Sequence, residues 1–77
     1  MYTKNDAARI VREYDPERKI DEIAEYKGQW ILATHTDDPY EGHMDGYFAV
    51  DRKTGKLSGW AYLSKENIEA WQRMFLK

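Results

Sequence analysis

The segment Tyr47–Tyr62 constrains the fold most, because two β-prone runs flank a turn that needs a glycine. We read residues 53–55 as a three-residue hairpin loop in which Gly55 takes a positive φ, a conformation without steric cost for glycine. In that register Phe48 faces Trp60 across the hairpin. The segment therefore predicts a β-hairpin and fixes the pairing of the strands around it.

A chain of 77 residues forms a single small domain, residues 1–77. Such a chain buries only roughly 60% of its unfolded surface. It has no cysteine, so neither a disulfide nor a thiolate metal site can stabilise it, and three Trp, six Tyr and two Phe must supply the core. Because no apolar stretch is long enough for a signal peptide or a membrane span, we expect a soluble, cytoplasmic protein without membrane contact.

The charged residues are balanced, with 14 acidic and 12 basic side chains interspersed along the chain and a net charge of −2. A nucleic-acid-binding domain usually carries a basic excess or stripe, and an acidic DNA mimic needs a far larger negative charge. We therefore expect no nucleic-acid partner.

The N-terminal residues 3–14 predict a helix. Thr3 is a suitable N-cap with Asp6 three residues later, and Pro16 ends the helix before it. The apolar stripe of this helix consists of Ala7, Ile10, Val11 and Tyr14.

A second helix is predicted at the C-terminus. Ser64 is expected to cap it, and Glu66 is favourably placed near its positive end. Its apolar stripe consists of Ile68, Trp71, Met74 and Phe75.

Residues 16–27 fit two structures. As a helix they have Asp15 as N-cap, Pro16 at the first position and Gly28 as the stop. As a strand they end in a two-residue turn at 27–28 that leads directly into the next strand at Gln29, and this tight junction favours the strand. The strand would place Ile20, Glu22, Ala24 and Tyr26 on one face.

Three further segments are β-like, namely 29–36, 46–51 and 57–63, and residues 37–45 form a polar loop. The predicted fold is α+β, with an N-terminal helix, a three- or four-stranded antiparallel sheet and a C-terminal helix.

Alternation along the strands assigns the side chains to two faces. One face would carry Trp30, Phe48, Trp60 and Tyr62, and the other would carry small residues that suit helix packing. If one helix covers each face, the aromatic residues are core, which is the usual role of apolar runs. If both helices share the small-residue face, these four residues bind a partner protein, because exposed Trp and Tyr are typical of interfaces.

The polar segment between the second and third predicted strands contains candidate metal ligands. If Gln29 faces Asp51, then His35, Asp37, His43 and Asp45 meet on one face, and imidazole and carboxylate groups bind zinc-like ions. A charged, solvated hairpin end explains the same residues, and we favour that explanation over a metal site.

The chain shows no catalytic or cofactor motif. It lacks the nucleophile elbow, the dinucleotide fingerprint and the phosphate loop. Ser58 and Ser64 are better explained as a strand residue and a helix cap. The acidic residues that could form an acid–base pair are Glu22, Glu25, Asp37, Asp38 and Glu41, and nothing in the sequence buries them. We expect no enzyme activity and no cofactor.

The string Tyr-x-x-Val-Asp-x-x-Thr-Gly-Lys-Leu, at residues 47–57, resembles small bacterial domains of the PepSY type. It is also similar to small helix-plus-sheet proteins grouped with toxin-immunity proteins, whose strands end in a Val-Asp-x-x-Thr-Gly hairpin. The resemblance implies a bacterial or phage-like protein in which a helix packs on an antiparallel sheet. It also implies inhibition, immunity or regulation through protein contact.

The sequence therefore leads to the hypothesis of a non-catalytic protein-binding module, an inhibitor, antagonist or regulator, that uses Trp30, Phe48, Trp60 and Tyr62. Two alternatives remain. The same face could join two copies of the chain, or residues 35–45 could bind a metal or small ligand. The small basic cluster of Arg52, Lys53 and Lys56 at the hairpin turn could in addition meet an acidic surface.

Overall fold

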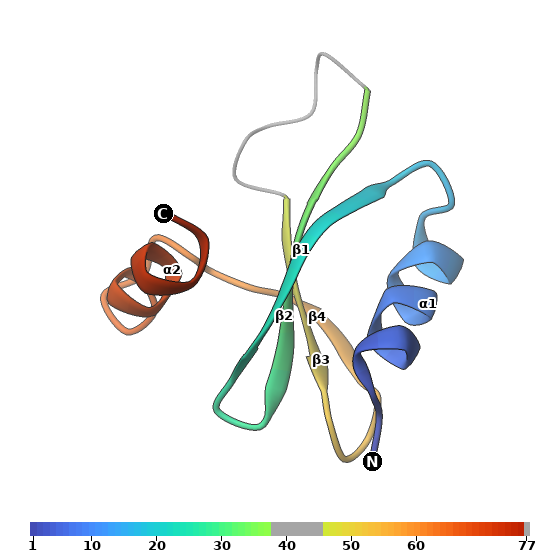
Figure 1. The fold of residues 1–77 in the computed structure, drawn as a ribbon, viewed down its shortest axis with the longest axis horizontal. Helices are drawn as coiled ribbons and strands as arrows, with labels where there is room; N and C mark the ends of the chain where they lie inside the picture. Colours follow the sequence, from blue (N-terminus) through green and yellow to red (C-terminus); the bar gives the residue numbers. More distant parts are fainter. Residues whose placement is uncertain (38–45, 77) are drawn as a thin grey trace.

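The computed structural model describes residues 1–37 and 46–76 and has the predicted α+β architecture. The four strands form one antiparallel sheet in the order β1-β2-β3-β4, with α1 on one face and α2 on the other (Figure 1). The elements are α1 (Lys4–Tyr14), β1 (Lys19–Tyr26), β2 (Gln29–His35), β3 (Tyr47–Asp51), β4 (Leu57–Gly59) and α2 (Ile68–Phe75).

Helix α1 begins as predicted. The Thr3 side chain accepts a hydrogen bond from the Asp6 backbone N–H, and the Asp6 carboxylate accepts one from the Thr3 backbone N–H. This reciprocal capping box satisfies two backbone donors that the first turn leaves free. The buried side of α1, which includes Ala7 and Val11, lies over β1 and β2.

The ambiguous residues 16–27 contain strand β1, as the tight junction predicts. Lys27 and Gly28 both have positive φ, 49° and 74°, the geometry of a two-residue turn that matches the twist of a hairpin. A bulge between Ile20 and Glu22 interrupts the alternation of the strand. Ile20 therefore packs on the α1 side, and the prediction that it shares a face with Tyr26 is wrong.

Strands β2 and β3 pair with Gln29 facing Asp51, Trp30 facing Val50 and Leu32 facing Phe48. This is the register on which the metal-site expectation was built. Residues 38–45, which connect the two strands, lie outside the described residues.

The predicted register of the β3–β4 hairpin is wrong by one residue. Phe48 faces Gly59 instead of Trp60, because the loop contains four residues, 52–55. The Asp51 carboxylate accepts hydrogen bonds from the backbone N–H groups of Lys53 and Thr54, at 2.7 and 3.0 Å, and stabilises this longer turn. Gly55 does take the predicted positive φ, 75°.

Helix α2 begins later than predicted. Its N-cap is Asn67, and the Ser64 side chain does not cap it. Instead, the Ser64 carbonyl accepts hydrogen bonds from the N–H groups of Asn67 and Ile68 in the turn that precedes the helix.

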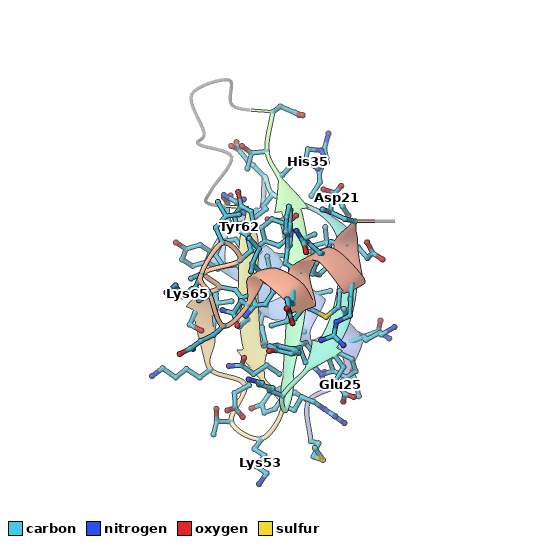
Figure 2. All side chains as sticks on the ribbon, turned by 90° about the vertical axis from the view of Figure 1, so that its left-hand side faces the viewer. Asp21, Glu25, His35, Lys53, Tyr62 and Lys65 are labelled. Carbon is cyan, nitrogen blue, oxygen red and sulfur yellow. The ribbon has the colours of Figure 1, made fainter. Side chains whose placement is uncertain are left out.

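Two apolar clusters share the sheet. On the α1 side, Ala7 and Val11 pack against Leu32 and Val50. On the α2 side, aromatic residues surround Ile31 and Ala49, and Figure 2 shows α2 lying across this face. Because neighbouring residues of β2 point to opposite faces, this strand contributes to both clusters.

Candidate functional site

The four residues predicted to form one binding face lie on two faces. Trp30 and Phe48 belong to the α1 side, and Trp60 and Tyr62 belong to the α2 side. The shifted β3–β4 register moves Trp60 to the opposite face from Phe48. Of the two helix arrangements considered, the structure has the one in which each face has its own helix, which is the arrangement that makes the aromatic residues core, and not the one in which both helices share a face (Figure 1).

Trp30 is held in place by residues at the hairpin turns. Its indole N–H donates a hydrogen bond to the Tyr2 carbonyl at 2.8 Å. The Arg52 guanidinium lies 5.0 Å from the centre of the Trp30 ring and pairs with the Glu25 carboxylate. These contacts join the N-terminal residues to two strands and give Trp30 a structural role.

Trp60 and Tyr62 are core residues of this chain, with only 8% and 9% of their surfaces exposed. Their rings contact neighbouring rings in edge-on or tilted orientations, with centroids 4.5–6.4 Å apart, as aromatic clusters prefer. The surrounding rings belong to Tyr26, Tyr47, Trp71 and Phe75.

Phe48 differs from the other three predicted residues because it is half-buried and lies beside an edge strand. Tyr14 contacts its ring from α1, and the Arg18 guanidinium lies 5.1 Å from the ring centre. Its neighbour on β4 is Gly59, which has no side chain to cover the ring. A Cβ added at Gly59 would meet nothing within 4 Å, so the space beside Phe48 is open.

Strand β4 has one edge that pairs with no other strand of the described residues. Asp51 donates its N–H to the Lys56 carbonyl, and Trp60 donates its N–H to the Tyr47 carbonyl. Since hydrogen-bonded pairs alternate along an antiparallel ladder, the N–H and C=O groups of Leu57 and Gly59 point away from β3. Among the described residues, no backbone group outside the sheet bonds to them.

The other edge strand, β1, has features that discourage pairing with another chain. It contains a bulge after Ile20 and four charged residues, whereas β4 contains no charged residue and no bulge. Charges and bulges on edge strands prevent unwanted strand addition. The charged residues of β1 are Lys19, Asp21, Glu22 and Glu25.

The residues next to β4 at the hairpin turn form a small basic cluster. Lys53 and Lys56 are exposed, while Arg52 is engaged with Trp30 and Glu25. The backbone N–H groups of the turn stabilise the ionised Asp51 carboxyl and hold its pKa below the usual range. Lys53 marks this end of the sheet in Figure 2.

The described residues of the candidate metal site contact other polar side chains. His35 and Asp21 lie close together (Figure 2), with His35 Nδ1 2.8 Å from an Asp21 carboxylate oxygen. Lys19 Nζ lies 3.2 Å from a carboxylate oxygen of Asp37. The other two predicted ligands, His43 and Asp45, lie outside the described residues. Within residues 1–37 and 46–76, no three His, Asp or Glu side chains come together as a metal site.

The candidate catalytic groups are not assembled into a site in the described regions. Glu25 pairs with Arg52, and Asp37 pairs with Lys19. Ser58 is exposed on β4, and the buried Ser64 hydroxyl has no hydrogen-bond partner among the residues described. Asp38 and Glu41 fall in the segment that is not described.

Comparison with protein families, with curated proteins and with solved structures finds no match. Neither described helix has the length and apolar character needed to cross a membrane.

Sequence reasoning missed the edge of β4 as a candidate site. The segment 57–63 was expected to be one strand, but the strand ends at Gly59 and the chain then leaves the sheet for α2. The lack of charge in Leu57-Ser58-Gly59 was a usable signal, but its meaning depends on β4 being the last strand of the sheet.

Proposed function

We propose that this chain is a non-catalytic protein-binding module that accepts an extended segment of a partner protein at β4. The observation that carries the proposal is the unpaired, uncharged edge at which Leu57 and Gly59 direct backbone donors and acceptors outward. Strand addition of this kind obtains affinity from main-chain hydrogen bonds and specificity from alternate side chains.

The side chains around β4 suit such an addition. The open space at Gly59 admits a side chain of the added segment, and the half-buried Phe48 and Leu57 offer apolar surface on the same face. The contacts in this region support a binding role for Phe48 and a structural role for Trp30, Trp60 and Tyr62.

Inhibition, antagonism or regulation in the cytoplasm fits a module with these properties, because binding at one edge can block a surface of the partner without any chemistry. A core aromatic residue such as Trp60 contributes to binding only indirectly, by holding β3 and β4 in place.

A photo-crosslinking amino acid at Ser58 tests this function in a lysate of the source cell. We expect adducts with a protein at position 58, loss of those adducts when Gly59→Lys is added, and none from the same probe at Gln72, an exposed residue of α2. Equal crosslinking from both positions, or adducts that survive Gly59→Lys, would contradict binding at β4.

A further inference from the structure

We infer that the segment that pairs with β4 is β4 of a second copy of this chain, in a twofold arrangement centred on Ser58. The inference rests on the proposed function of β4 as the binding element. It names the partner, and it predicts one continuous sheet made from the two four-stranded sheets.

The backbone groups of β4 are self-complementary. In an antiparallel alignment with Ser58 facing Ser58 of the second copy, Leu57 of each copy faces Gly59 of the other. Both residues direct N–H and C=O groups outward, so each such pair exchanges two hydrogen bonds. This alignment satisfies every outward group of the strand in both copies.

The side chains are complementary in the same alignment. Leu57 and Gly59 have the same parity, so they lie on the same face of the sheet as Phe48. Leu57 of one copy therefore enters the open space at Gly59 of the other and approaches the uncovered side of Phe48. A large side chain that covers an edge glycine is a known means of fixing strand pairing.

The charges permit β4 pairing and oppose pairing through β1. Lys56 would face Trp60 of the second copy, which separates the two Lys56 positions by about 13 Å along the ladder. That spacing exceeds the screening length of about 8 Å at physiological salt. Strand β1 instead carries a bulge and four charged residues, features that oppose strand addition at an edge.

Sedimentation of the full chain at increasing concentration, up to about 1 mM, tests the inference at the weak end of association expected for a small interface. We expect the mass to rise toward that of a dimer, and we expect Gly59→Lys to raise the dissociation constant at least about tenfold by placing a charge at the shared edge. Gln72→Lys adds the same charge on α2 and should behave as wild type.

A second variant tests the same contact in case Gly59→Lys does not fold. Methylation of the Gly59 amide nitrogen by chemical synthesis removes one outward donor without adding charge, and it should also weaken the dimer while circular dichroism stays native. NMR spectra of a mixture of isotope-labelled and unlabelled chains should show contacts between Leu57 of one copy and Gly59 of the other. A wild-type monomer at the highest concentration, or a dimer unaffected by both Gly59 changes, would overturn the inference.

The outcomes separate this inference from the proposed function. A chain that stays monomeric but crosslinks to another protein at Ser58, in a manner sensitive to Gly59→Lys, refutes the second copy as partner and retains β4 as the binding edge. A monomer that gives no crosslinks at Ser58 refutes both.

Discussion

Gly55 shows how one residue can be constrained in two ways. Its φ of 75° lies in the left-handed region, and a Cβ added there would lie 2.5 Å from the Tyr2 ring. Gly28 has nearly the same φ, 74°, but a Cβ there would meet nothing within 4 Å. The two glycines therefore separate the backbone cost of a side chain from the cost of displacing Tyr2.

We predict that Gly28→Ala lowers the free energy of unfolding by about 1–2 kcal/mol, the cost of a Cβ in the left-handed region. Gly55→Ala should cost more, because the Tyr2 ring must also move. In a Tyr2→Ala background the two substitutions should cost the same. Denaturant unfolding of the variants measures these differences, and an equal cost in the presence of Tyr2 would show that its ring does not constrain Gly55.

The exposed fraction of the Trp60 side chain distinguishes a core role from an interface role. Trp60 is 8% exposed within one chain, so we predict that Trp60→Ala lowers the free energy of unfolding by about 3–5 kcal/mol. A small domain has a total of only about 5–15 kcal/mol, so the variant should be largely unfolded or close to it. Tyr62→Ala tests the neighbouring ring in the same way. Native stability in both variants, by thermal melting, would contradict a core role.

At the scale of elements, the sequence was sufficient to predict a helix cap and a turn that depend on interactions between nearby residues. The capping box of Thr3 and Asp6 and the turn at residues 27–28 follow from interactions within a few residues, and both are present. The β3–β4 register was not readable, because the Asp51 carboxylate lengthens the turn by binding backbone N–H groups inside it. A hydroxyl such as that of Ser64 likewise suits a cap without being placed as one.

Asp6 in the N-terminal cap and Asp51 in the hairpin turn make these two structures sensitive to acid. Hydrogen bonds to the ionised carboxyls, from the Thr3 backbone to Asp6 and from the Lys53 and Thr54 backbone to Asp51, lower both pKa values. An unfolded chain therefore takes up these protons at a higher pH than the folded one. Their stabilising effect is complete above the unfolded pKa of about 3.9 and is lost as the pH falls through the folded pKa.

We predict that Asp51→Asn, which keeps the acceptor oxygen but cannot titrate, reduces the loss of stability between neutral pH and about pH 3. Asp6→Asn should act in the same direction at the helix. Asp37→Asn serves as a control, because Asp37 is exposed and pairs with Lys19 outside both motifs. Denaturant unfolding at the two pH values measures the effect, and an unchanged acid dependence in Asp51→Asn would contradict it.

At the scale of the whole molecule, the sequence could not show which faces the helices cover. Both helices have apolar stripes, and either could pack on either face until the sheet order and the connection after Gly59 are known. Because each face has its own helix, Trp60 and Tyr62 lie in the core, and the candidate site is the edge of β4 beside Phe48. That edge exists only in the assembled sheet, so local patterns did not indicate it.

The two apolar clusters should unfold together, because both depend on β2. Ile31 belongs to the α2-side cluster and its neighbour Leu32 to the α1-side cluster, so β2 cannot separate from one without disturbing the other. We predict a single transition. In the double variant Trp60→Phe/Trp71→Phe, Trp30 is the remaining tryptophan, and its fluorescence reports on the α1-side cluster. In Trp30→Phe, the remaining Trp60 and Trp71 report on the α2-side cluster.

Melting curves from both reporters should coincide with the far-ultraviolet circular dichroism of the same variant. Val11→Ala, a change in the α1-side cluster, should lower the melting temperature of both reporters equally, since its effect reaches the α2 side through β2. An α2-side signal that melts first, or that does not respond to Val11→Ala, would mean that α2 and its aromatic cluster form a separate unit. The short length of α2, eight residues, makes this the strictest test of cooperativity, because such a helix is not stable without packing against the sheet.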